Sequence, residues 1–174
     1  RLKSFEFEIN WLKKNNIQFS GNICDVGCST GEFKVFLDSE GNYFGMEINE
    51  KAISIAQARG VLFNKNILSE KEFFDLIIFR GTIQHVNNPF AYIERSFEAL
   101  SPGGYLAILA TPNVESFYYR VFNDLPALDK DRCFYLPGFD HLNRLILREG
   151  FELVDSCFPY LKSGYDSIIS DFSK

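Results

Sequence analysis

The sequence predicts an α/β fold, with a doubly wound, mostly parallel sheet and helices on both of its faces. Two observations lead to this class. Short apolar runs alternate with segments in which apolar residues recur at helical spacing, and turns rich in Gly, Pro or Asn separate the segments. Strands that alternate with helices form parallel βαβ units, so we expect ligands to bind outside the carboxyl ends of the strands.

The first half of the chain is predicted to form the following elements. Residues 1–16 carry apolar side chains at helical spacing and predict an amphipathic helix. Residues 22–26 form a strand that runs into a glycine-containing turn and a helix, and residues 43–48 form a second strand. Asn49 is placed to cap the next helix, since an Asn side chain accepts amide protons of the first helical turn. Residues 61–63 predict a weak third strand.

The second half repeats this alternation. Residues 75–79 form a strong fourth strand, and Pro89 begins a helix because its fixed backbone angle suits the first helical position. Residues 105–110 form a fifth strand. After a less regular aromatic stretch, a late helix around Leu142 precedes a sixth strand at residues 151–157.

Composition and charge exclude several classes of function. The chain has 174 residues and a net charge of −5, so it lacks the basic face on which nucleic-acid binding depends. Its longest apolar runs are too short to span a bilayer. The 4 Cys form no C-x-x-C pair and His is scarce, so we expect no metal site and a reducing, cytoplasmic setting.

The first strand runs into a loop with the sequence Asp25-Val-Gly-Cys-Ser-Thr-Gly31. Gly27 and Gly31 permit backbone angles that other residues avoid, and they allow a ligand to approach the main chain. The G-x-x-x-G spacing differs from the G-x-G-x-x-G of dinucleotide-binding loops. Asp25 would repel a pyrophosphate but suits a ligand with an ammonium group, so the loop disfavours a nicotinamide-dependent oxidoreductase. A plain strand–turn–helix is the alternative interpretation.

Glu47 ends the second strand, about 20 residues after the glycine-containing loop, where an acid accepts both ribose hydroxyl protons of a nucleotide-like cofactor. A surface Glu facing the positive end of the next helix is the alternative interpretation. Because the first loop is also present, the ligand interpretation is favoured.

Further motifs follow in a characteristic order, namely Phe74-Asp-Leu-Ile-Ile78, Ile83-Gln-His-Val86, Asn88-Pro89, Leu100-Ser-Pro-Gly-Gly104 and Thr111-Pro-Asn113. In order and spacing, residues 23–157 resemble class I S-adenosylmethionine-dependent methyltransferases. The Thr-Pro-Asn motif is most similar to the subgroup of ubiquinone-biosynthesis-type O-methyltransferases and bacterial methyltransferases of sugars and other small molecules. The resemblance implies a Rossmann-like fold, S-adenosylmethionine as cofactor and S-adenosylhomocysteine as product.

The resemblance also implies how the cofactor is held. The first loop would hold the methionine part, through Asp25, Gly27, Cys28, Ser29 and Gly31. At the end of the second strand, Glu47 would bind the ribose and Ile48 would pack on the adenine. The loop with Asn66 and Ile67 would contact the adenine amino group, and the loop with Arg80 and Gly81 would lie beside the sulfonium. Asn66 stands where the family usually has an acid, and either its oxygen accepts the same hydrogen bond or it is an ordinary loop Asn.

His85 occupies the His of the family's Glu-His-Val segment. It is the candidate general base for a hydroxyl acceptor, because imidazole titrates near neutrality, and a His that orients its own loop is the alternative. The chain departs from the family at three points. Gln84 replaces the usual Glu, Cys133 stands where a His often precedes the last helix, and too few apolar residues follow Tyr160 for the family's seventh strand. We expect that strand to be missing or reduced.

The sequence therefore predicts methyl transfer from S-adenosylmethionine to a small molecule, preferably at a hydroxyl oxygen. The chain would be one methyltransferase domain, with a helix at 1–16, a cofactor-binding core at 21–112, an acceptor-side cover at 113–140 and a last helix and strand at 141–160. The aromatic cover either lines an apolar pocket or is an ordinary helix that buries its apolar side. A cofactor-binding module without catalysis, part of a larger protein, is the second hypothesis.

Overall fold

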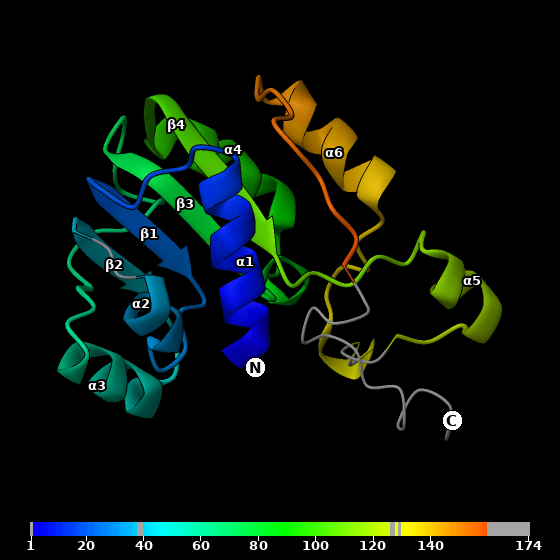
Figure 1. The fold of residues 1–174 in the computed structure, drawn as a ribbon, viewed down its shortest axis with the longest axis horizontal. Coiled ribbons are helices and arrows are strands. Elements are labelled where there is room, and N and C mark those ends of the chain that lie inside the picture. The colour runs from blue at the N-terminus through cyan, green and yellow to red at the C-terminus, as the bar shows by residue number, and fades with distance from the viewer. Residues whose placement is uncertain (1, 38–39, 126–127, 129, 160–174) are drawn as a thin grey trace.

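Four parallel strands form the sheet in the computed structural model, which describes residues 2–37, 40–125, 128 and 130–159. The strands are β1 (Asn22–Val26), β2 (Asn42–Met46), β3 (Phe74–Arg80) and β4 (Leu100–Leu109). They lie in the order β2-β1-β3-β4, and every neighbouring pair is parallel (Figure 1). The predicted α/β class with a parallel sheet is therefore confirmed.

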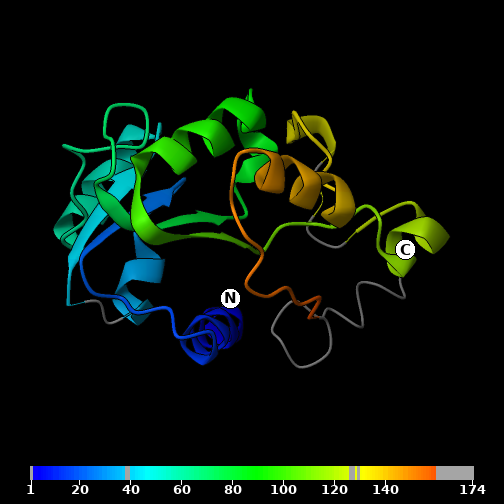
Figure 2. The same cartoon turned by 90° about the horizontal axis from the view of Figure 1, so that it is seen from above.

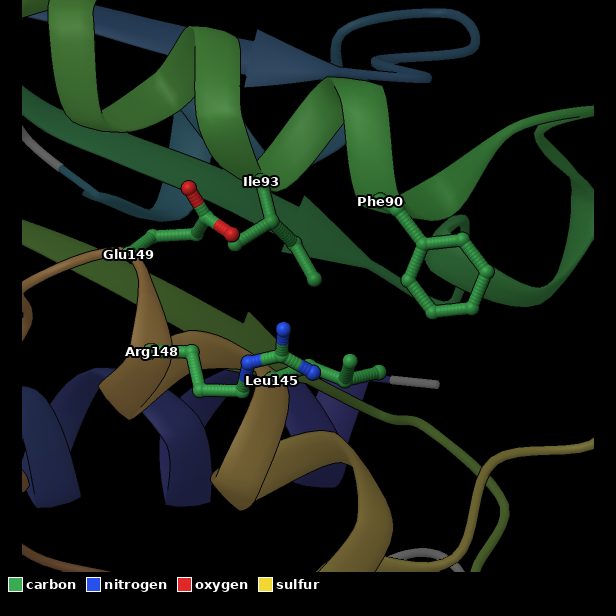
Figure 3. A pocket seen from close by; sticks show the side chains of 5 residues that line it. All are labelled: Phe90, Ile93, Leu145, Arg148 and Glu149. Atoms are coloured by element: carbon green, nitrogen blue, oxygen red, sulfur yellow. The ribbon is translucent and has the colours of Figure 1, made fainter.

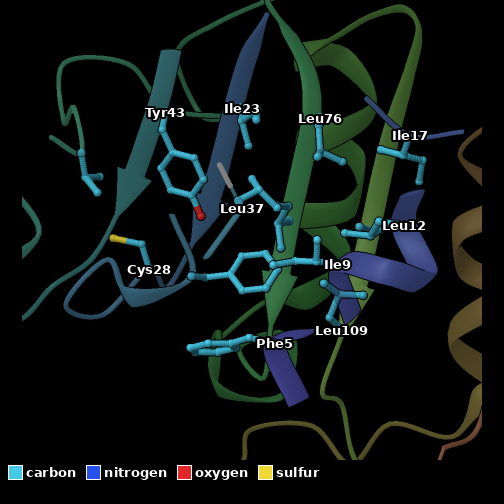
Figure 4. Packing of buried hydrophobic residues seen from close by; sticks show 14 of the residues in the cluster. Phe5, Ile9, Leu12, Ile17, Ile23, Cys28, Leu37, Tyr43, Leu76 and Leu109 are labelled. Carbon is cyan, nitrogen blue, oxygen red and sulfur yellow. The ribbon is translucent and has the colours of Figure 1, made fainter. Parts of the chain in front are cut away.

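Helices cover both faces of this sheet, as predicted (Figure 2). One face packs against α1 (Leu2–Lys14), α2 (Glu32–Leu37) and α3 (Glu50–Ala58), and the other against α4 (Pro89–Ala99) and α6 (Phe139–Arg148). Strand side chains alternate between the faces, so Ile23 joins the first hydrophobic cluster and Cys24 the second. Figure 4 shows the first cluster, in which apolar residues of α1 reach side chains of β1, β3 and β4.

Three shorter helices lie in the loops beyond the carboxyl ends of β3 and β4. They are α5 (Phe117–Phe122) and the 3-10 helices η1 (Ile83–His85) and η2 (Lys130–Arg132). None of the helices in the described part of the chain is long and apolar enough to cross a bilayer.

Two helix starts form as the sequence predicts. The side-chain oxygen of Asn49 accepts from the amides of Lys51 and Ala52 at 3.0 and 3.2 Å, which caps α3. Pro89 occupies the first turn of α4, where its missing N–H would have had no partner, and Asn88 caps that helix through the amide of Ala91.

The predicted third strand is reduced to one bridge, between Leu62 and Phe44. The amide of Leu62 donates to the carbonyl of Tyr43, and the amide of Gly45 donates to the carbonyl of Leu62, both at 2.8 Å. Gly60, with φ +79°, turns the chain two residues earlier, so the segment is too short to continue the ladder.

The predicted sixth strand at residues 151–157 is wrong, because this segment has no regular structure. It is bonded to α1 and not to β4. Trp11 Nε1 and Asn15 Nδ2 both donate to Asp155 Oδ2, at 2.9 and 3.0 Å. Asp155 Oδ1 also accepts from the amide of Ser156, which draws the backbone out of an extended ladder. The expectation of a missing or reduced seventh strand falls on residues outside the described part of the chain.

Strand β4 begins at Leu100, earlier than the predicted residue 105. It therefore includes the Pro102-Gly103-Gly104 segment. Pro102 is tolerated because β4 is the edge strand of the described sheet, where a missing N–H interrupts no ladder on the outer side. A register shift between Phe74 and Leu76 accommodates the extra residues of β4.

Candidate functional site

The loops after the four strands meet along the carboxyl edge of the sheet. The amide of Gly27, after β1, donates to the carbonyl of Met46, at the end of β2, at 2.7 Å. The amide of Gly81, after β3, donates to the carbonyl of Leu109, at the end of β4, at 2.8 Å. These bonds join the strand ends in two pairs, at the edge where parallel sheets bind their ligands.

The first loop contains three residues with left-handed backbone angles. Gly27, Ser29 and Gly31 have φ of +78°, +50° and +72°. A β-carbon on Gly27 would lie 2.5 Å from Thr82 Cγ2 and closer still to Thr82 Oγ1. Only glycine therefore fits at Gly27, and the loop after β1 packs directly against the loop that leads to His85.

Asp25 is a buried carboxylate, 2% exposed, at the end of β1. Tyr43 donates its hydroxyl proton to Asp25 Oδ2 at 2.7 Å, while Oδ1 is buried and has no hydrogen-bond partner among the described residues. Burial away from water raises the pKa of Asp25 to about 6. A buried carboxylate oxygen without a partner among the described residues is suited to a cationic donor, and the ammonium partner of Asp25 stays a prediction.

Glu47 joins the first loop to the second. Its Oε2 accepts from the amide of Ser29 at 3.0 Å, and its Oε1 accepts from the amides of Ile48 and Asn49 at 2.8 and 2.9 Å. A carboxylate offers about four acceptor positions, so capacity remains for a ligand hydroxyl. The side chain of Ile48 beside it is 98% exposed and presents a free apolar surface.

Asn66 and Ile67 are placed less favourably for contact through their side chains. Asn66 Oδ1 accepts from the amide of Leu68 at 2.9 Å, which is the local turn that an ordinary loop Asn makes. Ile67 is fully buried in the second hydrophobic cluster, so its side chain belongs to the core. A ligand at this loop would meet backbone groups more readily than these two side chains.

Arg80 directs its guanidinium toward α1. Its Nε and Nη2 donate to the two carboxylate oxygens of Glu8 at 2.6 and 3.1 Å, and Nη2 also donates to Ser4 Oγ at 3.1 Å. The guanidinium carbon lies 4.3 Å from the ring centre of Phe5. The charge of Arg80 is thus paired within the fold, so the predicted contact beside the sulfonium would come from its backbone.

His85 lies at the end of η1 with an exposed side chain. Its Nδ1 is 2.9 Å from the carbonyl oxygen of Arg132, in the segment that precedes α6. The preceding residue, Gln84, is buried, and its Nε2 donates to the carbonyl of Gly81 at 3.2 Å. Gln84 therefore stabilises the loop from inside, while His85 faces outward.

A family model for methyltransferase domains matches residues 9–156. The chain belongs to this family. The enzyme class predicted from the sequence, an S-adenosylmethionine-dependent methyltransferase, is thereby confirmed. Among curated proteins there is no significant match.

Solved structures are similar to this methyltransferase domain over most of its length. An S-adenosylmethionine-dependent methyltransferase from Thermotoga maritima, described as a possible histamine N-methyltransferase, is 27% identical with a TM-score of 0.66, covering 86% of this chain and 71% of that one. One from Archaeoglobus fulgidus is 18% identical (TM-score 0.64; 85% and 69% covered). Phosphoethanolamine N-methyltransferase 2 of Haemonchus contortus, in complex with S-adenosylmethionine, is 17% identical (TM-score 0.63; 83% and 36% covered). The last two show the fold alone.

Two cavities lie beside α6, and neither is lined by Asp25, Glu47 or His85. The smaller, about 220 Å³, lies between α4 and α6 and is lined by Phe90, Ile93, Leu145, Arg148 and Glu149 (Figure 3). The larger is a groove of about 1470 Å³ that runs along β4 between α1 and α6 and includes residues 110–113 at the carboxyl end of β4. The smaller cavity is below the usual size of a ligand site, so the groove is the candidate region for a methyl acceptor.

Helix α5 decides between the two interpretations of the aromatic cover. None of its residues is buried, and Phe117 is 82% exposed. Tyr118 and Phe122 stack on each other with ring centres 4.7 Å apart. Within the described residues α5 therefore does not bury its apolar side, and part of it lines the groove beside β4.

Two partners of the predicted site residues were not foreseen. Tyr43 holds Asp25, and Glu8 holds Arg80. Tyr43 lies two residues before Gly45, the register partner of Asp25, so the two side chains share one face of the sheet. Once the register of β1 and β2 is known, this pairing follows. For Glu8 the sequence offers less information. It shows only a charged residue among the apolar residues of α1, without indicating its partner.

Proposed function

We propose that this domain transfers a methyl group from S-adenosylmethionine to a hydroxyl oxygen of a small molecule, as in the subgroup with the Thr111-Pro-Asn113 motif. The hydrogen bond between His85 Nδ1 and the carbonyl of Arg132 supports this best. A carbonyl only accepts, so Nδ1 carries the proton and Nε2 presents its lone pair. A hydroxyl acceptor needs such a base, whereas a neutral amine attacks with its own lone pair.

S-adenosylmethionine is the cofactor of this domain, and when bound it supplies a methyl group already activated on a sulfonium. We assign its ammonium group to Asp25, whose unpaired Oδ1 suits a cation. One of its ribose hydroxyls is assigned to the remaining acceptor position of Glu47, and its adenine to the exposed side chain of Ile48. Gly27 and Gly31 would allow the methionine part to lie against the main chain.

In the proposed reaction His85 acts as the general base. The acceptor hydroxyl gives its proton to His85 Nε2, its oxygen bonds to the methyl carbon, and the electron pair of the broken carbon–sulfur bond stays on sulfur. S-adenosylhomocysteine leaves as a neutral thioether, so alignment of oxygen, carbon and sulfur is the main task of the protein. The groove beside β4 would hold the rest of the acceptor, under the exposed aromatic side chains of α5.

The chain acts, in this proposal, as one domain with its cofactor-binding core at residues 21–112 and its acceptor cover at 113–140. A reducing cytoplasm is the proposed compartment, supported by the sequence, whose 4 Cys form no C-x-x-C pair. The competing function is a module that binds the cofactor without catalysis. Release of S-adenosylhomocysteine with small phenols or amines separates the two, because the module would bind the product yet release none.

Gly27→Ala should weaken the binding of S-adenosylhomocysteine by at least about tenfold, because the methyl group strains a left-handed backbone and collides with Thr82. Calorimetric titration measures this affinity. Gly103→Ala is the matched control, since Gly103 has φ +82° and a β-carbon there would have no atom within 4 Å. Both variants carry the backbone strain, but only Gly27→Ala should lose affinity. Equal affinity in both would remove the loop from the cofactor site.

Affinity for S-adenosylhomocysteine should also fall as the pH falls through about 6. Burial raises the pKa of Asp25 to about 6, so below this pH Asp25 is neutral and no longer attracts an ammonium group. Binding at pH 5 should be about tenfold weaker than at pH 8. The stability of the fold depends on pH in the opposite direction. Because the folded state holds the proton of Asp25 more tightly than the unfolded state does, the contribution of Asp25 to the free energy of unfolding falls as the pH rises through about 6. Asp25→Asn should bind weakly at both pH values, and an unchanged pH profile in this variant would contradict the assignment.

A further inference from the structure

Residues 132–140, which we call the strap, run from the end of η2 into the first turn of α6. On the way they contact the loop after β3. The first half of the strap is hydrogen-bonded to Gln84 and His85, in the loop after β3. His85 Nδ1 lies 2.9 Å from the carbonyl oxygen of Arg132, and the carbonyl of Gln84 accepts from the amides of Phe134 and Tyr135 at 2.9 and 3.3 Å. The backbone of the strap thus contacts both Gln84 and the ring of His85.

The second half of the strap is bonded to the loop after β4. The amide of Val114 donates to the carbonyl of Pro137 at 3.0 Å. Asn113 Oδ1 accepts from the amide of Phe139 at 3.1 Å, and Glu115 Oε2 accepts from the amide of Asp140 at 2.7 Å. Two side chains from one loop thus hold the end of the strap.

These two side chains replace a missing helix cap. The first amides of a helix have no partner within the helix, and a Ser, Thr, Asn or Asp at the N-cap usually accepts from them. The N-cap of α6 is Gly138, which has no side chain. A β-carbon at Gly138 would lie 2.5 Å from Glu115 Oε1, so glycine at this position makes room for the borrowed cap.

We infer that Asn113 and Glu115 are positioning residues for His85. By capping α6 they fix the strap, and the Arg132 carbonyl of the strap then holds the His85 imidazole with Nδ1 protonated and Nε2 free. This inference rests on the proposed function, in which His85 Nε2 accepts the hydroxyl proton. It gives the Asn of the Thr-Pro-Asn motif a positioning role that its side chain performs through the amide of Phe139, separately from its place in the lining of the groove.

The size of the effect follows from one hydrogen bond. The two neutral tautomers of imidazole lie close in free energy, and a typical hydrogen bond shifts such an equilibrium by about 2- to 13-fold. Loss of the Arg132 carbonyl should therefore convert one dominant tautomer into a mixture. In the Nε2-protonated form His85 cannot accept a proton at Nε2, so turnover falls in proportion.

Nitrogen-15 NMR of the uniformly labelled protein, without cofactor or acceptor, measures the tautomer directly. The chain has 2 His, so His141→Gln assigns the His85 signals. We expect the Nδ1-protonated tautomer in the wild type and a mixture in Asn113→Leu. Asn113→Asp should restore the wild-type spectrum, because its carboxylate oxygen accepts the same amide protons. Glu115→Leu and Glu115→Gln form the second matched pair, with a mixture expected only in the former.

Turnover completes the test. Asn113→Leu should lower kcat with a small phenol by up to about twofold, since a tautomer ratio that falls by about 2- to 13-fold to near unity leaves about half of the molecules competent. It should leave KM for S-adenosylmethionine unchanged and be rescued by Asn113→Asp. An Nε2-protonated wild type overturns the inference even if the Leu variants fail to fold, and so does an unchanged spectrum in a folded Asn113→Leu protein. Failure of the proposed function would be seen elsewhere, as missing affinity for S-adenosylhomocysteine or missing turnover in a protein whose His85 tautomer is as expected.

Discussion

Replacing Arg80 with Met should lower the free energy of unfolding by about 3–5 kcal/mol, because it removes the Arg80 cation from the buried carboxylate of Glu8. The Glu8 side chain is 3% exposed and that of Arg80 15%, with Arg80 Nε 2.6 Å from Glu8 Oε2. Burial already raises the pKa of Glu8 despite the lowering by Arg80. Without Arg80 the carboxyl will be neutralised at still higher pH, and the loss of stability should be larger at pH 8 than at pH 5.

Urea denaturation of three variants tests this expectation. The double variant Glu8→Gln/Arg80→Met should recover most of the loss, since no buried charge remains. Arg95→Met is the control, because the Arg95–Glu98 pair has side chains 47% and 39% exposed and should contribute only about 0–1 kcal/mol. If Arg80→Met loses no more than Arg95→Met, the ion pair does not hold α1 to the carboxyl end of β3.

Features that depend on a few neighbouring residues were predictable from the sequence. The spacing of Gly27 and Gly31 predicted a loop with left-handed backbone angles, and both residues have them. Asn49 was recognised as a cap because its side-chain oxygen and the two amides that donate to it, those of Lys51 and Ala52, lie within three residues of each other. The placement of Glu47 at the end of a strand likewise follows from local periodicity, because parallel strands bring their carboxyl ends to one edge.

Features that depend on distant partners were not predictable. Arg80 was expected beside the cofactor, but its guanidinium pairs with Glu8, which lies 72 residues away in the sequence. Residues 151–157 have the composition of a strand, yet Asp155 is bonded to Trp11, 144 residues away, and no ladder forms. In both cases local pattern describes what a segment can do, while the choice among partners is made by packing across the fold.

The cap on α6 depends both on a local motif and on a distant partner. Asn113 was noticed as part of a motif, but a motif states neither the partner nor the purpose of a side chain. The structure supplies the partner, the amide of Phe139, and the strap then links that amide to the carbonyl beside His85. Asn113 can therefore influence the base through the strap, independently of its place in the lining of the groove.

Replacing His85 with Ala should lower turnover of a small phenol by a factor of about 10²–10⁴, the usual contribution of a positioned general base. The rate of S-adenosylhomocysteine release measures it. A phenol has an ordinary pKa of about 10, so as the pH approaches this value the solvent itself supplies phenolate. The deficit of His85→Ala should consequently narrow at high pH, whereas a defect in cofactor binding or folding would persist.

His141→Ala is the control for this experiment. His141 is the other His of the chain; it is exposed on α6, with its ring centre 6.0 Å from that of Tyr135, and it has no place in the proposed reaction. Its removal should leave turnover within about twofold, well below the loss from a missing base. Near-normal turnover in His85→Ala would assign this His to orientation of its loop. A loss of equal size at every pH would point to the same role, because only proton removal is replaced by a more basic solvent.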